Sequence, residues 1–350
     1  MALWRDNIGR MAGYTPGEQP KDRRYIKLNT NENPYPPSPK ALAALAAVTG
    51  DRLRLYPDPT ADSLRELAAE RYGLPGRDWV LAGNGSDDLL TIAVRTFVEA
   101  GGALAHPEPS YSLYPVLAEL QGARAVAVPL DAEFALPADA AAQAAGCSLF
   151  FLARPNAPTG TLFPRAAVEA LCRDFPGVVW IDEAYGDFAP DNCLDFPARF
   201  PNVVVSRTFS KSYSLAGLRL GLALASPVLI EQMLKVKDSY NVNYLTQLVG
   251  EAALADRSYL RRRTEEVCCT RDRTAAALAA LGCTVCPSAT NFLFVKPARA
   301  TAAAVFAGLR DNGILVRYFP KGRTGDYLRI SVGTNSEMDA LITTMQELMA

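Results

Sequence analysis

Short apolar runs rich in β-branched residues recur between longer helical stretches, and this alternation limits the fold more than any other feature. The runs lie at 79–82, 125–128, 149–153, 178–181, 203–206 and 220–225. Two of the intervening stretches, 87–99 and 165–174, carry apolar residues at helical spacing. Strands that alternate with helices form βα units around a mostly parallel sheet. We therefore expect an α/β fold whose central sheet lies between helices.

The pattern changes after about residue 235. A long charged helix is expected over 260–281, and shorter strands are expected at 291–295, 314–317 and 327–332. The opening segment is rich in Pro, Asn and Tyr and has little periodicity, which is typical of an extended arm. We expect three parts: an arm over 1–38 that joins the small domain, a large domain over 39–235, and a small α+β domain over 236–350.

Charge and composition exclude several classes of protein. The chain has 36 basic and 37 acidic residues, so no overall field favours nucleic acid or an anionic membrane. No apolar run approaches the roughly 18 residues of a membrane helix, and the start lacks the apolar core of a signal peptide. Seven cysteines in 350 residues are too sparse for a disulfide scaffold. We expect a cytoplasmic protein with reduced thiols and with neither nucleic acid nor a membrane as partner.

Metal and nucleotide motifs are scarce. His106 is the only histidine, which removes most zinc sites and Ser-His-Asp arrangements. Cys283 and Cys286 form a single C-x-x-C, a weak indication without a second pair or clustered histidines. Neither a G-x-G-x-x-G nor a P-loop string occurs in the sequence. We expect no metal site, and neither a nicotinamide dehydrogenase nor a P-loop enzyme.

Polar segments follow directly after several expected strands, where open α/β sheets bind their ligands. They are Gly83-Asn84-Gly85-Ser86-Asp87, Arg154-Pro155-Asn156-Ala157-Pro158-Thr159-Gly160, Asp182-Glu183-Ala184-Tyr185, Ser206-Arg207-Thr208-Phe209-Ser210-Lys211 and Gly217-Leu218-Arg219-Leu220-Gly221. Each segment alone has an ordinary explanation, such as a helix cap or a solvated lysine. Their joint occurrence at strand ends predicts one shared site.

The order of these segments resembles the fold type I family of pyridoxal-phosphate (PLP) enzymes over nearly the whole chain. The resemblance implies that Lys211 carries the cofactor as a Schiff base and then moves a proton between the substrate Cα and C4′. It implies that Asp182 pairs with the pyridine nitrogen. Tyr185 and Asn156 are expected to donate to the phenolic oxygen of the ring, and Tyr111 to stack on its face.

The resemblance also implies a phosphate site built from a helix start and side-chain donors. The expected groups are the backbone N–H groups of Gly85, Ser86 and Asp87 and the side chains of Thr208, Ser210 and Arg219. The Asp87 carboxylate is electrostatically unsuited to a phosphate, so only its backbone is assigned there. Arg219 could instead serve as a structural ion-pair partner.

Within this family, the segments 14–17, 28–34, 56–58, 83–87 and 327–334 resemble histidinol-phosphate aminotransferases. The resemblance implies a homodimer in which Tyr56 reaches the cofactor phosphate of the neighbouring subunit. Arg329 is expected to bind the substrate carboxylate or phosphate, and Tyr14 and Asn33 to contact the substrate. The implied reaction is transamination between histidinol phosphate and 2-oxoglutarate in histidine biosynthesis.

Two departures from the family pattern leave alternatives open. Arg154 stands where the family more often has Asn, and Asp88 stands where it usually has Glu. Aromatic or other amino-acid aminotransferases and a threonine-phosphate decarboxylase share the same lysine, aspartate and phosphate site. A PLP-binding regulator is disfavoured because no basic DNA-reading segment is appended.

Overall fold

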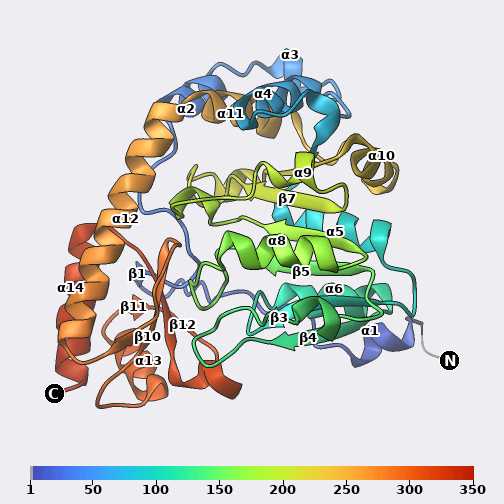
Figure 1. The fold of residues 1–350 in the computed structure, drawn as a ribbon. Coiled ribbons are helices and arrows are strands. Elements are labelled where there is room, and N and C mark those ends of the chain that lie inside the picture. The colour runs from blue at the N-terminus through green and yellow to red at the C-terminus, as the bar shows by residue number, and fades with distance from the viewer. Residues whose placement is uncertain (1–2) are drawn as a thin grey trace.

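The computed structural model describes residues 3–350, so residues 1 and 2 of the expected arm lie outside the described residues. Its main sheet has seven strands in the order β2-β8-β7-β6-β5-β3-β4 (Figure 1). The strands are β2 (Val80–Gly83), β3 (Ala103–Glu108), β4 (Arg124–Pro129), β5 (Leu149–Ala153), β6 (Val178–Asp182), β7 (Val203–Thr208) and β8 (Gly221–Ala225). The two pairings that β8 makes, with β2 and with β7, are antiparallel, and all other pairings are parallel. The expected α/β fold with a mostly parallel sheet is confirmed.

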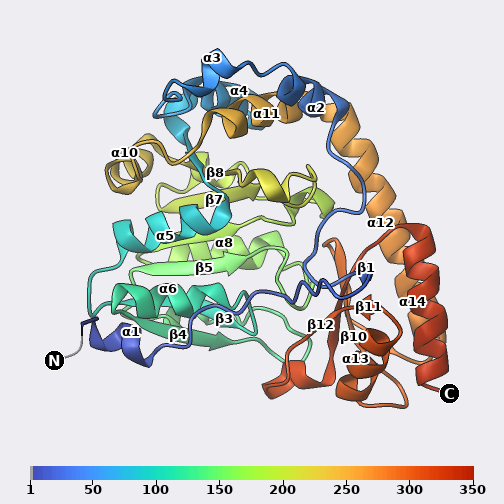
Figure 2. The ribbon, with the colours of Figure 1, turned by 180° about the vertical axis from the view of Figure 1, so that it is seen from behind.

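Helices cover both faces of this sheet, as Figures 1 and 2 show from opposite sides. One face carries α5 (Ser86–Phe97), α6 (Leu113–Gln121) and α10 (Pro227–Val236); the other carries α7 (Ala140–Gln143), α8 (Arg165–Asp174) and α9 (Phe196–Arg199). Successive residues of β5 enter different cores: Phe151 packs with the α5 side, whereas Phe150 and Leu152 pack with the α8 side. A strand buried on both faces explains why 149–153 is an uninterrupted apolar run.

A further helical layer lies beside β2 and β8, at the top of Figure 1. It contains α2 (Pro39–Ala46), α3 (Gly50–Leu53), α4 (Asp62–Tyr72) and α11 (Tyr244–Ala255). Val249 of α11 shares a core with Leu64 of α4 and Leu222 of β8. The expected boundary at 236 therefore marks the end of α10 but not the last element packed on the large sheet.

The long helix α12 (Arg257–Ala280) connects the two domains. Leu260, near its start, packs in the core of the large domain, whereas Leu278, near its end, packs in the core of the small domain. We propose that the domain boundary lies within this helix.

The small domain is built on a four-stranded antiparallel sheet in the order β12-β13-β10-β9. Its elements are β9 (Thr284–Val285), β10 (Phe292–Lys296), α13 (Ala302–Asp311), β11 (Ile314–Leu315), β12 (Arg317–Tyr318), β13 (Leu328–Ser331) and α14 (Asn335–Leu348). A capping box between Thr334 and Glu337 starts α14. Short 3₁₀ turns occur at Arg77–Trp79, Gly186–Phe188, Ala216–Leu218 and Gly322–Asp326.

The N-terminal arm crosses from the large to the small domain (Figure 2). Its helix α1 (Asp6–Arg10) lies beside α6, where Asn7 Nδ2 donates to the Glu119 carbonyl at 2.6 Å. Its strand β1 (Ile26–Lys27) pairs in parallel with β11, and Leu28 enters the small-domain core. Within residues 3–350, no helix combines the length and apolar character that crossing a bilayer requires.

Candidate active site

A cavity of about 660 Å³ lies where the arm, the small domain and the carboxyl ends of the parallel strands meet. The expected site residues that line it are Tyr14, Ser86, Asp87, Tyr111, Asp182, Tyr185, Thr208, Ser210, Lys211, Arg219 and Arg329. Four others lie outside its lining: Asn33, Tyr56, Gly85 and Asn156. The fold thus brings together residues that lie more than 300 positions apart in the sequence.

Lys211 is the amine at the centre of the expected chemistry. It follows β7 in the chain and is partly buried, and its Nζ donates to the carbonyl of Thr30 at 3.2 Å. Burial and, to a smaller extent, the charge of Arg329 together lower the pKa of Lys211 to about 8, against the opposing effect of Glu32. Because part of the population is neutral near physiological pH, the amine can act as a nucleophile and accept a proton.

Asp182 ends β6 as a buried carboxylate. It accepts hydrogen bonds from the Tyr114 hydroxyl at 3.1 Å, the Ser206 hydroxyl at 3.3 Å and the Ala184 N–H at 3.1 Å. Burial raises the pKa of Asp182 to about 6. No cationic side chain among residues 3–350 forms an ion pair with it. An ionised carboxylate in this position requires a cationic partner, such as a protonated ring nitrogen.

The start of α5 provides an anion site. Gly85 precedes the helix with φ of 87°, and no side chain caps the first N–H groups. A Cβ on Gly85 would collide with the guanidinium of Arg219, so only glycine lets this arginine lie against the helix start. Arg219 Nη1 also donates to Ser210 Oγ at 3.1 Å, and Nη2 lies 3.6 Å from Asp87 Oδ2. These donors suit a phosphate group.

Tyr111 forms one wall of the cavity. Its hydroxyl donates to Asp87 Oδ1 at 3.2 Å, and its ring meets Tyr114 edge-on with centroids 5.6 Å apart. Burial raises the pKa of Tyr111, so the phenol stays protonated. Tyr14 of the arm contacts the same ring at 6.0 Å, which places the arm at the cavity.

Two arginines enter the cavity from the small domain. Arg329 of β13 donates through Nη2 to the Asn29 carbonyl at 2.9 Å, while its buried Nε has no partner among the described residues. Arg317 of β12 lies directly opposite Arg329 in the strand register. Both guanidinium groups lie 5.5 Å from the ring centroid of Phe319. An unpaired buried donor beside a second arginine favours an anionic ligand at this end of the cavity.

Sequence reasoning missed Arg317. It ends the expected strand 314–317, but the sequence does not show that this strand would pair with the one that carries Arg329. Arg317 also holds the arm, because its Nη groups donate to the carbonyls of Thr15 at 2.9 Å and Pro16 at 3.1 Å.

Asn156 lies behind the cavity wall and is fully buried. Its Nδ2 donates to the Pro109 carbonyl and to Thr159 Oγ1, both at 3.0 Å, and its Oδ1 accepts from Ser110 at 2.8 Å. Both amide hydrogens are therefore bound within the protein. Of the two expected donors to the ring oxygen, Tyr185 is the one that lines the cavity.

Asn33 and Tyr56 also lie outside the cavity lining. Asn33 Nδ2 donates to the carbonyls of Lys211 at 3.3 Å and Ser212 at 3.2 Å, so it holds the lysine loop. Tyr56 is 82% exposed and stacks on Tyr240 with ring centroids 4.6 Å apart.

The comparisons with known proteins decide the family. The family model described as aminotransferase class I and II matches residues 23–345. The chain belongs to this family. A histidinol-phosphate aminotransferase from Synechocystis sp. is 47% identical over 99% of both chains.

Solved structures agree with this assignment. The histidinol-phosphate aminotransferase from Sinorhizobium meliloti, crystallised in complex with pyridoxal-5′-phosphate, matches with a TM-score of 0.90 and 28% identity, covering 100% of this chain and 98% of that one. An aspartate aminotransferase mutant from Thermus thermophilus shares the fold, with a TM-score of 0.83 and 17% identity, covering 99% and 100%. The resemblance found in the sequence is confirmed.

The cavity of this aminotransferase fits PLP. The uncapped start of α5 and Arg219 suit its phosphate, and Asp182 without an ion pair suits its ring nitrogen. Lys211 is the amine with a lowered pKa that can bind the aldehyde carbon.

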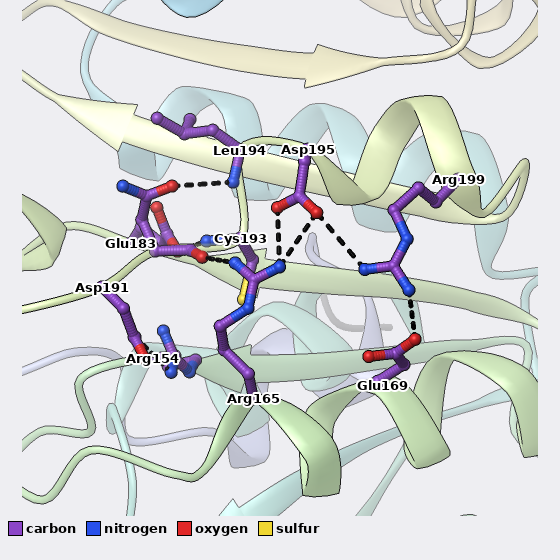
Figure 3. Close-up of polar contacts among 10 residues, drawn as sticks. Arg154, Arg165, Glu169, Glu183, Asp191, Cys193, Leu194, Asp195 and Arg199 are labelled. Atoms are coloured by element: carbon purple, nitrogen blue, oxygen red, sulfur yellow. Dashed lines mark hydrogen bonds and ion pairs between the residues drawn. The ribbon is translucent and has the colours of Figure 1, made fainter.

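The departure at Arg154 has a structural explanation. Its side chain is buried, Nε donates to the Phe163 carbonyl at 2.8 Å, and Nη2 pairs with Asp191 at 2.6 Å. Figure 3 shows this pair beside the pairing of Arg165 with Asp195. Together these contacts hold the loop 189–195, which follows Tyr185 in the chain.

Asp88 stabilises a turn, and the cysteines form no disulfide. Asp88 Oδ2 accepts from the Asn84 N–H at 2.8 Å and from Asn241 Nδ2 at 3.0 Å, which stabilises the turn before α5. Cys283 and Cys286 enter different cores, and all seven cysteines are free. Within residues 3–350, no three His, Cys, Asp or Glu side chains are grouped to hold a metal.

Proposed function

We propose that this aminotransferase uses PLP to transfer an amino group between histidinol phosphate and 2-oxoglutarate, with imidazole acetol phosphate and glutamate as the other pair. The observation that carries the proposal is the facing pair Arg317 and Arg329 in the same cavity as Lys211. Lys321 lines that end as well. Several cations suit a dianionic phosphate, whereas a carboxylate needs one arginine. The 47% identity to a histidinol-phosphate aminotransferase supports the same substrate.

When bound, PLP supplies an electron sink for negative charge at the substrate carbon that carries the amine. Asp182 would hold the protonated ring nitrogen, and its three neutral donors keep the carboxylate in place. Lys211 would take the proton from that carbon as a base and pass it on to C4′ of the cofactor as an acid, because its pKa of about 8 allows both protonation states.

The arm and the two arginines would orient the substrate. Arg317 binds the carbonyls of Thr15 and Pro16, so an anion at this arginine meets the arm directly. Tyr14 and Tyr111 would close the adjoining wall and exclude water. The substrate phosphate then lies at the small-domain end, and the amine faces Lys211.

The test compares histidinol phosphate with histidinol, which lacks the phosphate. We expect Arg317→Ala to raise KM for histidinol phosphate by roughly 10- to 100-fold, the effect of one charge-assisted hydrogen bond, and to change KM for histidinol little. Arg310→Ala is the matched control, because Arg310 binds Glu18 of the arm and lies outside the cavity lining.

Equal losses on both substrates in Arg317→Ala would contradict a phosphate role. Turnover of phenylalanine ahead of histidinol phosphate would favour the alternative, an aromatic amino-acid aminotransferase. Release of carbon dioxide from threonine phosphate would favour the decarboxylase.

We further propose a homodimer that shares its active sites. Large apolar side chains are exposed on and after α2 and α3: Leu42, Leu45, Leu53, Leu55 and Tyr56. Tyr240, which follows α10, is also exposed and stacks on Tyr56. Exposed apolar side chains gathered in this way are typical of subunit interfaces. Tyr56 would reach the cofactor phosphate of the neighbouring subunit.

Seven free cysteines support a reducing, cytoplasmic location.

Mixed dimers test the shared site. Lys211→Ala subunits should be inactive and Tyr56→Ala subunits weakened, and a mixture should exceed the summed activity of the two, because one site of each hybrid then has both residues. A monomer in light scattering, or no recovery from subunits shown to exchange, would contradict the proposal.

A further inference from the structure

Asn31 is a buried residue with every polar group engaged. It adopts φ of 57°, a left-handed conformation that asparagine tolerates better than most residues. Its N–H donates to Ser331 Oγ at 2.8 Å, and its carbonyl accepts from Asn291 Nδ2 at 3.0 Å. Its Oδ1 accepts from Ser331 Oγ at 2.9 Å, and its Nδ2 donates to the Tyr185 hydroxyl at 2.9 Å.

These contacts fix which way the Asn31 amide faces. The Ser331 hydroxyl already accepts from the Asn31 N–H, and its single proton needs an acceptor. Oδ1 is that acceptor, so the NH₂ group must point at Tyr185. The opposite orientation would leave the Ser331 proton without an acceptor in this contact.

The Asn31 amide in turn fixes the proton of Tyr185. The Tyr185 oxygen accepts from Asn31, so its own proton must point elsewhere. The Tyr185 hydroxyl donates no hydrogen bond within residues 3–350, and Tyr185 lines the cavity. The ring is held by Phe292, edge-on at 5.1 Å. The free direction of the hydroxyl is therefore into the cavity, where the cofactor ring oxygen would lie.

We propose that Asn31 is a positioning residue that directs the Tyr185 proton at the ring oxygen of PLP and links it to the strand that carries Arg329. Ser331 lies two residues after Arg329 on β13, whereas Tyr185 follows β6 of the large domain. The hydrogen bond from Asn31 to Tyr185 thus crosses between the domains.

The test measures the pKa of the bound cofactor from its visible absorbance at different pH values. A hydrogen bond donated to an oxygen stabilises the form with more negative charge on it, so loss of the bond raises this pKa. We expect Asn31→Gly to raise it by roughly one unit. Glycine accepts the positive φ, so the variant removes the amide without adding backbone strain.

The matched variants separate positioning from general damage. Tyr185→Phe should raise the same pKa, because it removes the hydrogen bond to the ring oxygen. Asn31→Gly should add nothing further in that background, because Asn31 acts only through that same hydrogen bond. Ser331→Ala should give a smaller shift of the same sign, since the amide is then free to turn. The charged groups near Tyr185 are Asp87, Asp182, Lys211 and Arg329, and all stay in place in these variants.

An unchanged pKa in Asn31→Gly, or an equal shift in the presence and absence of the Tyr185 hydroxyl, would overturn the inference. The inference rests on the proposed cofactor but not on the proposed substrate. A protein without the absorbance band would overturn both, whereas failure of the inference alone would appear in a protein that keeps the band. If Asn31→Gly raised KM for the amino donor without shifting the cofactor pKa, Asn31 would have a structural role only.

Discussion

Replacement of Asp182 by asparagine should have opposite effects on the empty and the cofactor-loaded protein. Burial raises the pKa of Asp182 from 3.8 to about 6. The folded apoprotein therefore holds this proton more tightly than the unfolded chain does. The contribution of protonated Asp182 to the stability of the folded apoprotein is complete below about pH 4 and is lost as the pH rises through about 6. A shift of about two units corresponds to about 3 kcal/mol.

An amide cannot ionise, so Asp182→Asn avoids this loss. We expect the variant apoprotein to unfold with a free energy about 3 kcal/mol higher than the wild type above pH 6, and with no gain below pH 4. Urea unfolding of both apoproteins from pH 4 to pH 8 measures the difference, in which the other titrating groups cancel. A constant difference across this range would refute the reasoning.

The loaded protein should show the reverse. Without the carboxylate, the protonated ring nitrogen loses its partner, which costs roughly 3 to 5 kcal/mol for a buried ion pair. Asp182→Asn should therefore bind PLP at least 100-fold more weakly in equilibrium dialysis. Unchanged affinity would show that Asp182 is a buried structural acid and not a cofactor ligand.

Three further predictions concern Lys211, the Arg154 loop and the thiols. The rate at which the apoprotein captures PLP should rise with pH through about 8 and be absent in Lys211→Ala; a pH-independent rate in stopped-flow absorbance would contradict the lowered pKa. Asp191→Ala should cost about 2 kcal/mol in urea unfolding, because it removes the carboxylate partner of the buried Arg154, and a loss below about 0.5 kcal/mol would argue against that pair. A thiol reagent should modify one cysteine quickly, since Cys269 is exposed and five of the others are buried; rapid modification of several thiols would contradict this packing.

The sequence predicted the elements with strong periodicity and missed those without it. The run 149–153 and the helix 165–174 match β5 and α8 because apolar residues mark them clearly. β3 was missed, since its sequence ALAHPE lacks β-branched residues. The packing of α11 on α4 and β8 could not be predicted, because the periodicity of this helix shows an apolar face but not which neighbour covers it.

The site residues likewise divide into those that a sequence rule locates and those that depend on tertiary contacts. The rule that ligands bind beyond the carboxyl ends of strands located Asp182, Lys211 and Arg219. It could not locate Arg317, which depends on strand register, or Asn31, whose partners lie 154 and 300 positions away. The direction of a side-chain amide, as in Asn156, is set by tertiary contacts that no local pattern records.

Half-reactions test the central proposal most directly. The purified protein with PLP is mixed separately with histidinol phosphate, glutamate, phenylalanine or threonine phosphate, and the cofactor absorbance is followed for wild type and Lys211→Ala. We predict rapid loss of the absorbance band with histidinol phosphate and with glutamate, and no loss in the variant. A reaction with phenylalanine alone would keep the aminotransferase and contradict the substrate, and a protein that binds no PLP would contradict the whole account.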